Sequence, residues 1–184
     1  MIDWLCDGTS RVLDFGCGNG TLLFLCALRG TTNHLGIDLS QEAILCAKRK
    51  AERMSRGMFS FWQGGVEQLS KIADASFDAI ILSNIIDNLY PEDANLLVDE
   101  CARILQGSGK VLVKLNPHLS KEQIADWSIK EISGNLLDDG LLLWNNTTEE
   151  WRDFFSSRFN ILRENEVYYP EHDQTNRLFY LIKS

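Results

Sequence analysis

Two short apolar runs in the middle of the chain place the strongest constraint on its fold. Residues 80–82 (IIL) and 111–113 (VLV) are rich in β-branched side chains, and neither run alternates between apolar and polar residues. A strand without such alternation is covered on both faces, which is typical of a parallel sheet with helices packed above and below it. The chain is therefore expected to contain a buried, mostly parallel sheet.

The remaining apolar runs alternate along the chain with segments of helical periodicity. Helices are expected after the glycines at 16–20 as far as Gly30, and from Ser40, Pro91 and Thr147 onward. This order predicts an α/β fold in three layers, in which a doubly wound sheet carries helices on both faces. Residues 1–184 are expected to form a single domain. The expected strands are 11–15, 34–37, 58–61, 77–82, 110–115, 159–162 and 178–182.

The segment 116–146 does not follow this alternation. It contains a short helical pattern at 121–127 and an apolar turn at 136–144. It follows the fifth expected strand, at the sheet edge where loops usually carry substrate specificity. The segment is therefore a candidate substrate-side insertion, and the alternative is an extra packing layer.

Composition narrows the classes of partner and compartment. The formal net charge is −8, which makes nucleic acid an unlikely partner because the phosphate backbone is also negative. The five cysteines form no C-x-x-C pair, as expected for reduced thiols in the cytoplasm. No apolar stretch approaches the roughly 18 residues that a membrane-spanning helix needs, so no membrane contact is expected.

The glycine-rich stretch after the first strand indicates a ligand site. Gly16, Gly18 and Gly20 stand between that strand and the next helix. Glycine allows a positive φ and has no Cβ, so a ligand can lie directly against the backbone. The start of the helix adds free N–H groups and a positive potential.

Two classes of nucleotide ligand use such a loop. A dinucleotide site requires G-x-G-x-x-G/A, but Thr21 occupies the third position here. Asp38, 20 residues after Gly18, suits the ribose hydroxyls of either class. Asp14 would repel a pyrophosphate but would attract the ammonium group of S-adenosylmethionine, which carries no phosphate. The alternative role for Asp14 is to cap the backbone of the loop itself.

Three stretches, 14–20 (DFGCGNG), 36–40 (GIDLS) and 76–84 (SFDAIILSN), resemble the successive motifs of the class I S-adenosylmethionine-dependent methyltransferases. The resemblance runs in order from about residue 9 to residue 115, and the run at 178–182 is similar to the last strand of that family. It implies S-adenosyl-L-methionine as the cofactor. It also implies a seven-stranded sheet of order 3-2-1-4-5-7-6 whose last strand is antiparallel.

The family pattern also implies roles for individual residues. The backbone of Gly16, Cys17 and Gly18 would line the methionine end of the cofactor, next to Asp14. Asp38 would hold the ribose, and Leu39 would pack on the adenine.

Further along the chain, Gly65, Val66 and Glu67 stand where the family often has an acid, a small residue and another acid. The first acid usually contacts the adenine amino group, so Gly65 is a departure, although the Val66 N–H can still reach the ring. Ser83 and Asn84 would end the fourth strand near the sulfonium.

Candidates on the substrate side follow from position alone. Asp87 and Tyr90 follow the fourth strand, His118 follows the fifth, and Trp144 closes the irregular segment. For each of these residues the alternative is a loop cap or a packing residue. The histidines His34, His118 and His172 are isolated, so no metal site is expected. No catalytic residue is predicted.

The sequence therefore predicts a methyltransferase that acts on a small-molecule acceptor by direct in-line transfer. One alternative is a non-catalytic module of the same fold that binds S-adenosylmethionine or a partner. A less favoured alternative is a nicotinamide-dependent oxidoreductase. A homo-oligomer is a candidate assembly.

Overall fold

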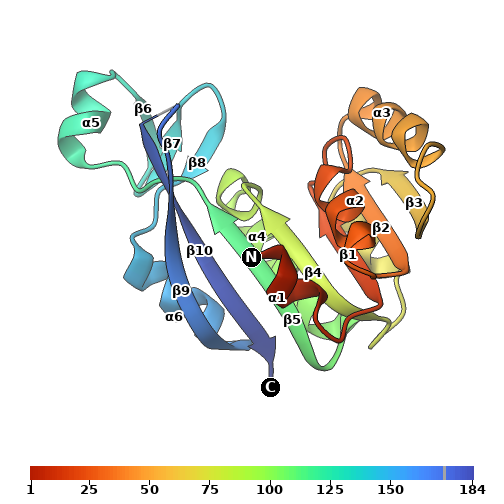
Figure 1. The fold of residues 1–184 in the computed structure, drawn as a ribbon. Coiled ribbons are helices and arrows are strands. Elements are labelled where there is room, and N and C mark those ends of the chain that lie inside the picture. The colour runs from red at the N-terminus through yellow and green to blue at the C-terminus, as the bar shows by residue number, and fades with distance from the viewer. Residues whose placement is uncertain (172) are drawn as a thin grey trace.

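A seven-stranded sheet forms the centre of the computed structural model, which describes residues 1–171 and 173–184 (Figure 1). The strand order is β3-β2-β1-β4-β5-β10-β9, and β10 runs antiparallel to β5. The predicted order and the antiparallel last strand are confirmed. His172 lies outside the described residues. The strands are β1 Arg11–Phe15, β2 Asn33–Asp38, β3 Met58–Gln63, β4 Phe77–Ser83, β5 Leu105–Leu115, β9 Phe159–Tyr169 and β10 Gln174–Lys183.

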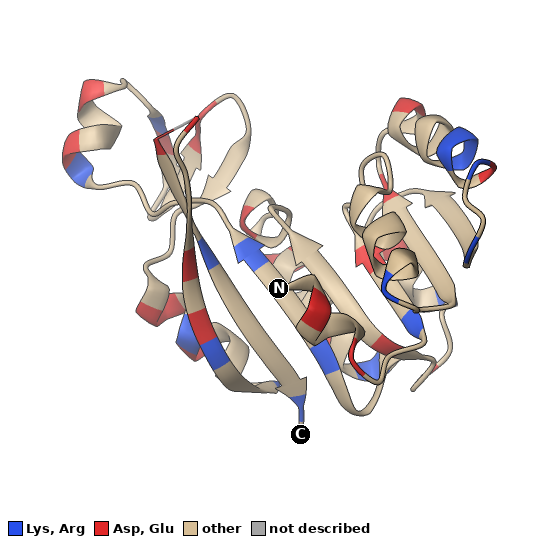
Figure 2. Cartoon of the chain, in the orientation of Figure 1, with Lys and Arg blue, Asp and Glu red and all other residues tan. Residues whose placement is uncertain are grey.

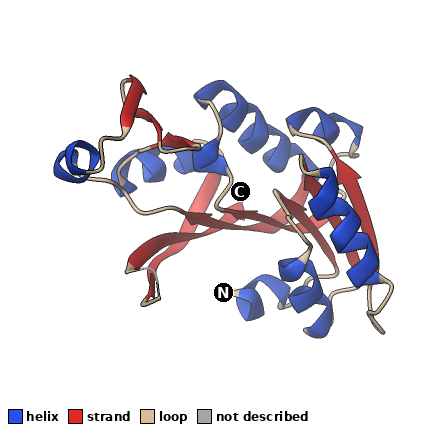
Figure 3. Ribbon diagram, turned by 90° about the horizontal axis from the view of Figure 1, so that it is seen from above, coloured by secondary structure: helices blue, strands red, loops and turns tan. Residues whose placement is uncertain are grey.

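Helices cover both faces of the sheet, as the apolar runs predict (Figure 3). One face carries three α-helices, and the other carries two α-helices and a 3-10 helix. The first set is α1 Ile2–Cys6, α2 Thr21–Leu28 and α3 Gln41–Ala51, and the second set is η1 Val66–Lys71, α4 Pro91–Ile104 and α6 Thr148–Ser156.

The residues of β4 show why its sequence lacks alternation. Ile80 and Leu82 pack into the core under α4, while Ala79 and Ile81 pack into the core under α2. All four are almost completely buried. Because each large apolar side chain contributes about 1.5–3 kcal/mol on burial, both faces of this strand stabilise the fold.

Local signals set the helix starts. The Ser40 side chain accepts a hydrogen bond from the Ala43 N–H, and Thr147 and Glu150 form a capping box at the start of α6. Pro91 occupies the first turn of α4. Each of these helices begins where the sequence predicts it.

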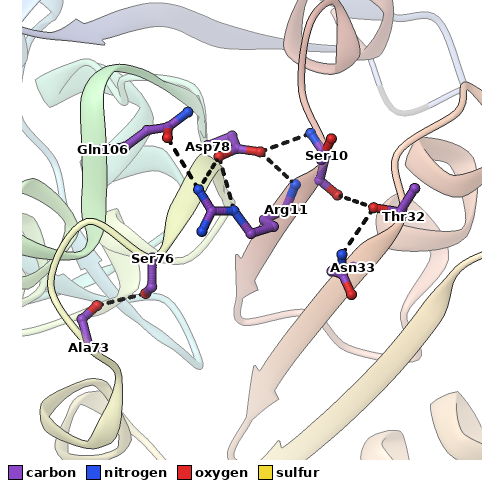
Figure 4. Close-up of polar contacts among 8 residues, drawn as sticks. All are labelled: Ser10, Arg11, Thr32, Asn33, Ala73, Ser76, Asp78 and Gln106. Atoms are coloured by element: carbon purple, nitrogen blue, oxygen red, sulfur yellow. Dashed lines mark hydrogen bonds and ion pairs between the residues drawn. The ribbon is translucent and has the colours of Figure 1, made fainter.

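A polar network joins the amino ends of the central strands, opposite the glycine loop (Figure 4). Asp78 of β4 accepts hydrogen bonds from the Ser10 and Arg11 backbone N–H groups, both at 2.9 Å. The Arg11 guanidinium donates to the same carboxylate at 2.7 Å and to the Gln106 side chain at 3.2 Å. The network fixes β1 against β4 and leaves the carboxyl ends of the strands free for a ligand.

The segment 116–146 forms a small unit of its own. The predicted short helix is present as α5 Lys121–Asp126, but the expected apolar turn is instead a hairpin of β7 Leu136–Asp138 and β8 Leu142–Trp144. The strand β6 Lys130–Ser133 pairs with β7, and all its residues are exposed, so it carries no apolar pattern that reasoning from sequence can detect. The unit has a separate apolar core of Leu119, Ile129, Leu137 and Leu143.

Candidate functional site

The loop between β1 and α2 follows a path that depends on glycine. Gly16 and Gly18 have φ angles of 75° and 52°, in the left-handed region that side chains disfavour. The N–H groups of Gly16 and Cys17 both donate to the Ile37 carbonyl, at 2.8 and 3.0 Å. The loop is thereby folded across the end of β2, with α2 starting directly after it.

Asp38 connects this loop to the next helix. Its Oδ2 accepts a hydrogen bond from the Gly18 N–H at 2.7 Å, and its Oδ1 accepts one from the Ser40 N–H at 2.9 Å. A carboxylate has about four acceptor positions, so both oxygens can still accept hydrogen bonds from ligand hydroxyls.

Asp14 lies beneath the loop and is 1% exposed. Within the part of the chain that the structure describes, its buried Oδ1 has no hydrogen-bond partner. Burial, and secondarily the charge of Asp38, raise the pKa of Asp14 well above its usual range. Burial also raises the pKa of the neighbouring Cys17 thiol. A buried carboxyl group that lacks a partner fits a ligand that brings a cationic group to this loop.

A cavity of about 480 Å³ opens at the carboxyl ends of β1 and β2, beside the loop. Five residues expected at the cofactor site line it, namely Gly16, Asp38, Leu39, Gly65 and Val66. The exposed Leu39 side chain is one of its apolar walls.

Reasoning from sequence missed several other residues that line this cavity. Ile85 and Leu89 come from the loop after β4, and Asp93 and Leu96 come from the first turns of α4. Asp93 and Leu96 are three residues apart, so they share one helix face, but nothing in the sequence indicates that this face meets the glycine loop. Glu67 also lines the cavity, and its carboxylate folds back over Gly65.

The charge of the cavity has one sign. Asp38, Glu67 and Asp93 contribute carboxylates, and none of the described residues that line the cavity is Lys, Arg or His. Such a site attracts a cationic ligand and disfavours one with phosphate groups.

Ser83 and Asn84 end β4 next to this cavity without lining it. Asn84 has a φ of 53°, uncommon for a residue other than glycine, and it is exposed. Its Oδ1 accepts a hydrogen bond from the Asn176 side chain at 3.3 Å, and its N–H donates to the Lys114 carbonyl at 2.7 Å. The turn after β4 is therefore held by β5 and β10.

Asp87 is buried rather than open to a ligand. It belongs to the short 3-10 helix η2 Ile86–Asn88, and its Oδ2 accepts a hydrogen bond from the Asn116 N–H at 2.7 Å. Burial raises the pKa of Asp87. The nearby Arg177 guanidinium donates to the carbonyls of Asn116 and Asn146, at 2.9 and 2.8 Å. These contacts hold both ends of the segment 116–146.

The other substrate-side candidates differ in their surroundings. Tyr90 and His118 are exposed. Trp144 packs edge-on against Trp151, with ring centroids 5.0 Å apart, and its Nε1 donates to Asn135 Oδ1 at 3.1 Å. Trp144 therefore anchors the hairpin to α6.

A second cavity of about 480 Å³ lies between the segment 116–146, η2 and the start of β10. Asn88 lines this cavity, and the next residue, Leu89, lines the first one, so the two cavities are neighbours across η2. Its walls combine leucines and an indole with side-chain amides and two acids. The lining residues are Asn88, Asn116, Pro117, Leu119, Gln123, Trp127, Asp139, Leu141, Leu143, Asp173, Gln174 and Thr175.

Comparison with known proteins identifies the family. A family model described as a methyltransferase domain matches residues 13–113, more than half of the 184-residue chain. The chain belongs to the class I S-adenosylmethionine-dependent methyltransferases. The sheet order and the glycine loop of this chain agree with that membership.

Two curated relatives show how far the similarity extends. A ubiquinone biosynthesis O-methyltransferase of Paracidovorax citrulli is 33% identical over 101 residues, covering 55% of this chain and 41% of the relative. A tRNA N(3)-methylcytidine methyltransferase of Schizosaccharomyces pombe is 26% identical over 165 residues, covering 85% of this chain and 53% of the relative. The chain thus spans about half the length of these relatives.

A solved structure supports the fold over nearly the whole chain. The S-adenosylmethionine-dependent methyltransferase of Methanosarcina mazei superposes with a TM-score of 0.77 at 20% sequence identity, covering 95% of this chain and 92% of the other. Over residues 1–171 and 173–184, no helix of this chain is long and apolar enough to cross a membrane.

Proposed function

We propose that this chain transfers a methyl group from S-adenosylmethionine to a small acceptor that is uncharged or cationic. The observation that carries the proposal is the sign of the charge in the first cavity. Asp38, Glu67 and Asp93 line it, and no basic side chain is among its described lining residues. A sulfonium and an ammonium suit this lining, whereas a pyrophosphate does not.

The residues of the cavity fit this cofactor. Asp38 would accept hydrogen bonds from the ribose hydroxyls, and Leu39 would pack on the adenine. Asp14, buried beneath the loop, would pair with the ammonium end. Gly18 has open space where a Cβ would stand, which leaves room for the ligand on the backbone, whereas the corresponding space at Gly16 is filled by Ile85.

S-adenosylmethionine supplies a methyl group on a sulfonium, which is already a good leaving group. The work left to the chain is to hold the acceptor in line with that methyl group and to exclude water. A general base is required only if the acceptor atom must lose a proton. The proposal therefore needs no catalytic residue beyond those that position the two ligands.

The second cavity would hold the acceptor. Leu119, Leu141 and Leu143 give it apolar walls, and Trp127 adds an exposed indole. Among the described residues, the charged side chains that line it are acids, which disfavours carboxylate or phosphate acceptors. The position next to the first cavity, across η2, would bring the acceptor close to the methyl group.

A small molecule is favoured over nucleic acid for two reasons. The net charge of −8 and the acids Asp139 and Asp173 in the second cavity oppose a phosphate backbone. The Lys and Arg residues at the end of α3 have a structural role (Figure 2). Lys48, Arg49 and Lys50 form the last turn of that helix and complement its dipole. The name of the ubiquinone biosynthesis relative supports a small-molecule acceptor, and the tRNA methyltransferase relative is the reason to test RNA as well.

The compartment and the assembly belong to the same proposal. Five free cysteines, four of them buried, suit the reducing cytoplasm. A homo-oligomer stays a prediction that a sedimentation measurement can test.

A thermal shift assay tests the function. S-adenosylhomocysteine at about 100 times its Kd is expected to raise the Tm by about 5–10 °C, and NAD is expected to have no effect. A shift with NAD alone would support the oxidoreductase alternative. Binding without methyl transfer to small phenols, amines or tRNA would support the non-catalytic module. No shift with either ligand would contradict the proposal.

A further inference from the structure

The Glu67 carboxylate folds back over Gly65, the position where this sequence lacks the acid of the family pattern. The Gly65 N–H donates to both oxygens of the Glu67 carboxylate, at 2.9 Å to Oε1 and 3.1 Å to Oε2. The carboxylate is thus turned back toward the start of η1 instead of extending into solvent.

The Glu67 carboxylate fills the space in which a side chain at position 65 would begin, so a side chain there would displace it. A Cβ built on Gly65 would lie 2.9 Å from Glu67 Oε2, closer than real Cβ contacts, and 3.5 Å from Leu39 Cδ2. The backbone of Gly65 has a φ of −109°, which does not require glycine. The glycine therefore leaves room for the Glu67 carboxylate beside Leu39.

This carboxylate remains an acceptor. The Gly65 N–H lowers the pKa of Glu67, so the group is ionised at neutral pH. Oε1 also accepts a hydrogen bond from the Gln68 side-chain amide at 3.3 Å, so the free acceptor position is on Oε2. Glu67 lines the cavity. An ionised carboxylate can only accept hydrogen bonds.

We propose that the Glu67 carboxylate accepts the hydrogen bond from the 6-amino group of the adenine and selects a 6-amino purine over a 6-oxo purine. The inference rests on the proposed function. A 6-oxo purine presents a carbonyl oxygen where the amino group donates, so two acceptors would face each other. The Val66 N–H, adjacent in the chain, is the expected donor to the ring nitrogen.

The other acids of the cavity are less suited to this role. Asp38 is held by Gly18 and Ser40 on the side of the glycine loop, where the ribose is expected. Asp93 stands on α4, and it provides a matched control because it is an exposed acid of the same cavity.

Isothermal titration calorimetry with S-adenosylhomocysteine and S-inosylhomocysteine tests the assignment. The wild-type protein is expected to bind the adenosyl compound about 10- to 100-fold more tightly than the inosyl compound. Glu67→Ala should reduce this ratio to within about threefold of unity, whereas Asp93→Asn should keep it. The double variant Gly65→Asp with Glu67→Ala should restore the ratio, because an acid returns to the same space.

The outcomes separate this inference from the proposed function. Adenosyl binding with a ratio that Glu67→Ala leaves unchanged would overturn the role of Glu67 alone. A ratio near one in the wild-type protein, or one that Asp93→Asn abolishes, would do the same. A wild-type protein that binds neither compound would contradict the proposed function, and the role of Glu67 with it.

Discussion

The Asp38 carboxylate accepts a hydrogen bond from the Gly18 N–H at 2.7 Å, so the residue that ends β2 holds the loop that follows β1. The other oxygen of Asp38 accepts one from the Ser40 N–H. A single side chain thus fixes the glycine loop relative to α3 before a ligand arrives. Such preorganisation lowers the entropy that binding must overcome.

Asp38→Ala should affect both stability and binding. Two hydrogen bonds to a charged group are lost, so the free energy of unfolding should fall by about 1–3 kcal/mol. Affinity for S-adenosylhomocysteine should fall at least about tenfold, because the ribose loses its acceptor. Urea denaturation and calorimetry measure the two effects. Asp99→Ala, which removes an exposed acid paired with Arg158, should change neither by a comparable amount.

Asp14→Asn should show a pH-dependent difference from the wild-type protein. The pKa of Asp14 is raised in the folded state. The stability that its carboxyl group contributes is therefore fully present below the unfolded pKa near 3.8, and it is lost as pH rises through the folded pKa. The variant should therefore gain stability relative to wild type with rising pH, by up to about 1.4 kcal/mol per unit. Urea denaturation of the ligand-free proteins from pH 4.5 to pH 8 measures this. A difference that does not vary with pH would show that Asp14 is ionised in the folded state.

Arg177→Met should loosen the segment 116–146 at both ends. The guanidinium loses its bonds to the Asn116 and Asn146 carbonyls, and the buried Asp87 loses a nearby positive charge. A loss of about 2–4 kcal/mol is expected, with faster hydrogen exchange across the segment. Arg158→Met, which removes a surface arginine, is the matched control. Unchanged exchange in Arg177→Met would mean that the hairpin is anchored elsewhere.

Trp127→Ala and Trp144→Ala should differ sharply in stability. Trp127 is 60% exposed on the wall of the second cavity, so its loss should change the free energy of unfolding by less than about 0.5 kcal/mol. Trp144 packs against Trp151 and Phe154, and its removal should cost about 2–4 kcal/mol. Chemical denaturation compares them, and equal losses would remove the distinction between a cavity wall and a packing residue.

The sequence predicted the order of elements and the glycine loop because both depend on local patterns. Runs that lack alternation are buried on both faces, and Ser40, Pro91 and Thr147 mark helix starts through bonds within one turn. Asp38 was found because it stands at the carboxyl end of a strand that pairs with β1.

The sequence could not predict contacts that depend on how distant segments meet. Trp144 is a packing residue only because α6 lies against the hairpin, and Asp87 is buried only because Asn116 and Arg177 close over it. The strand β6 escaped notice because pairing with β7, rather than an apolar face, makes it a strand.

The amino-acid sequence alone determined the alternation of strands and helices, the glycine loop and the charge sign of the candidate ligand, since these follow from local pattern and residue type. The sheet order was implied by the family resemblance. The tertiary structure decided which side chains share a cavity. Asn84 and Asn176 are 92 residues apart yet form a hydrogen bond, and the Asn116 N–H donates to the Asp87 carboxylate, 29 residues away. Such contacts depend on the packing of the whole chain, which no short stretch of sequence specifies.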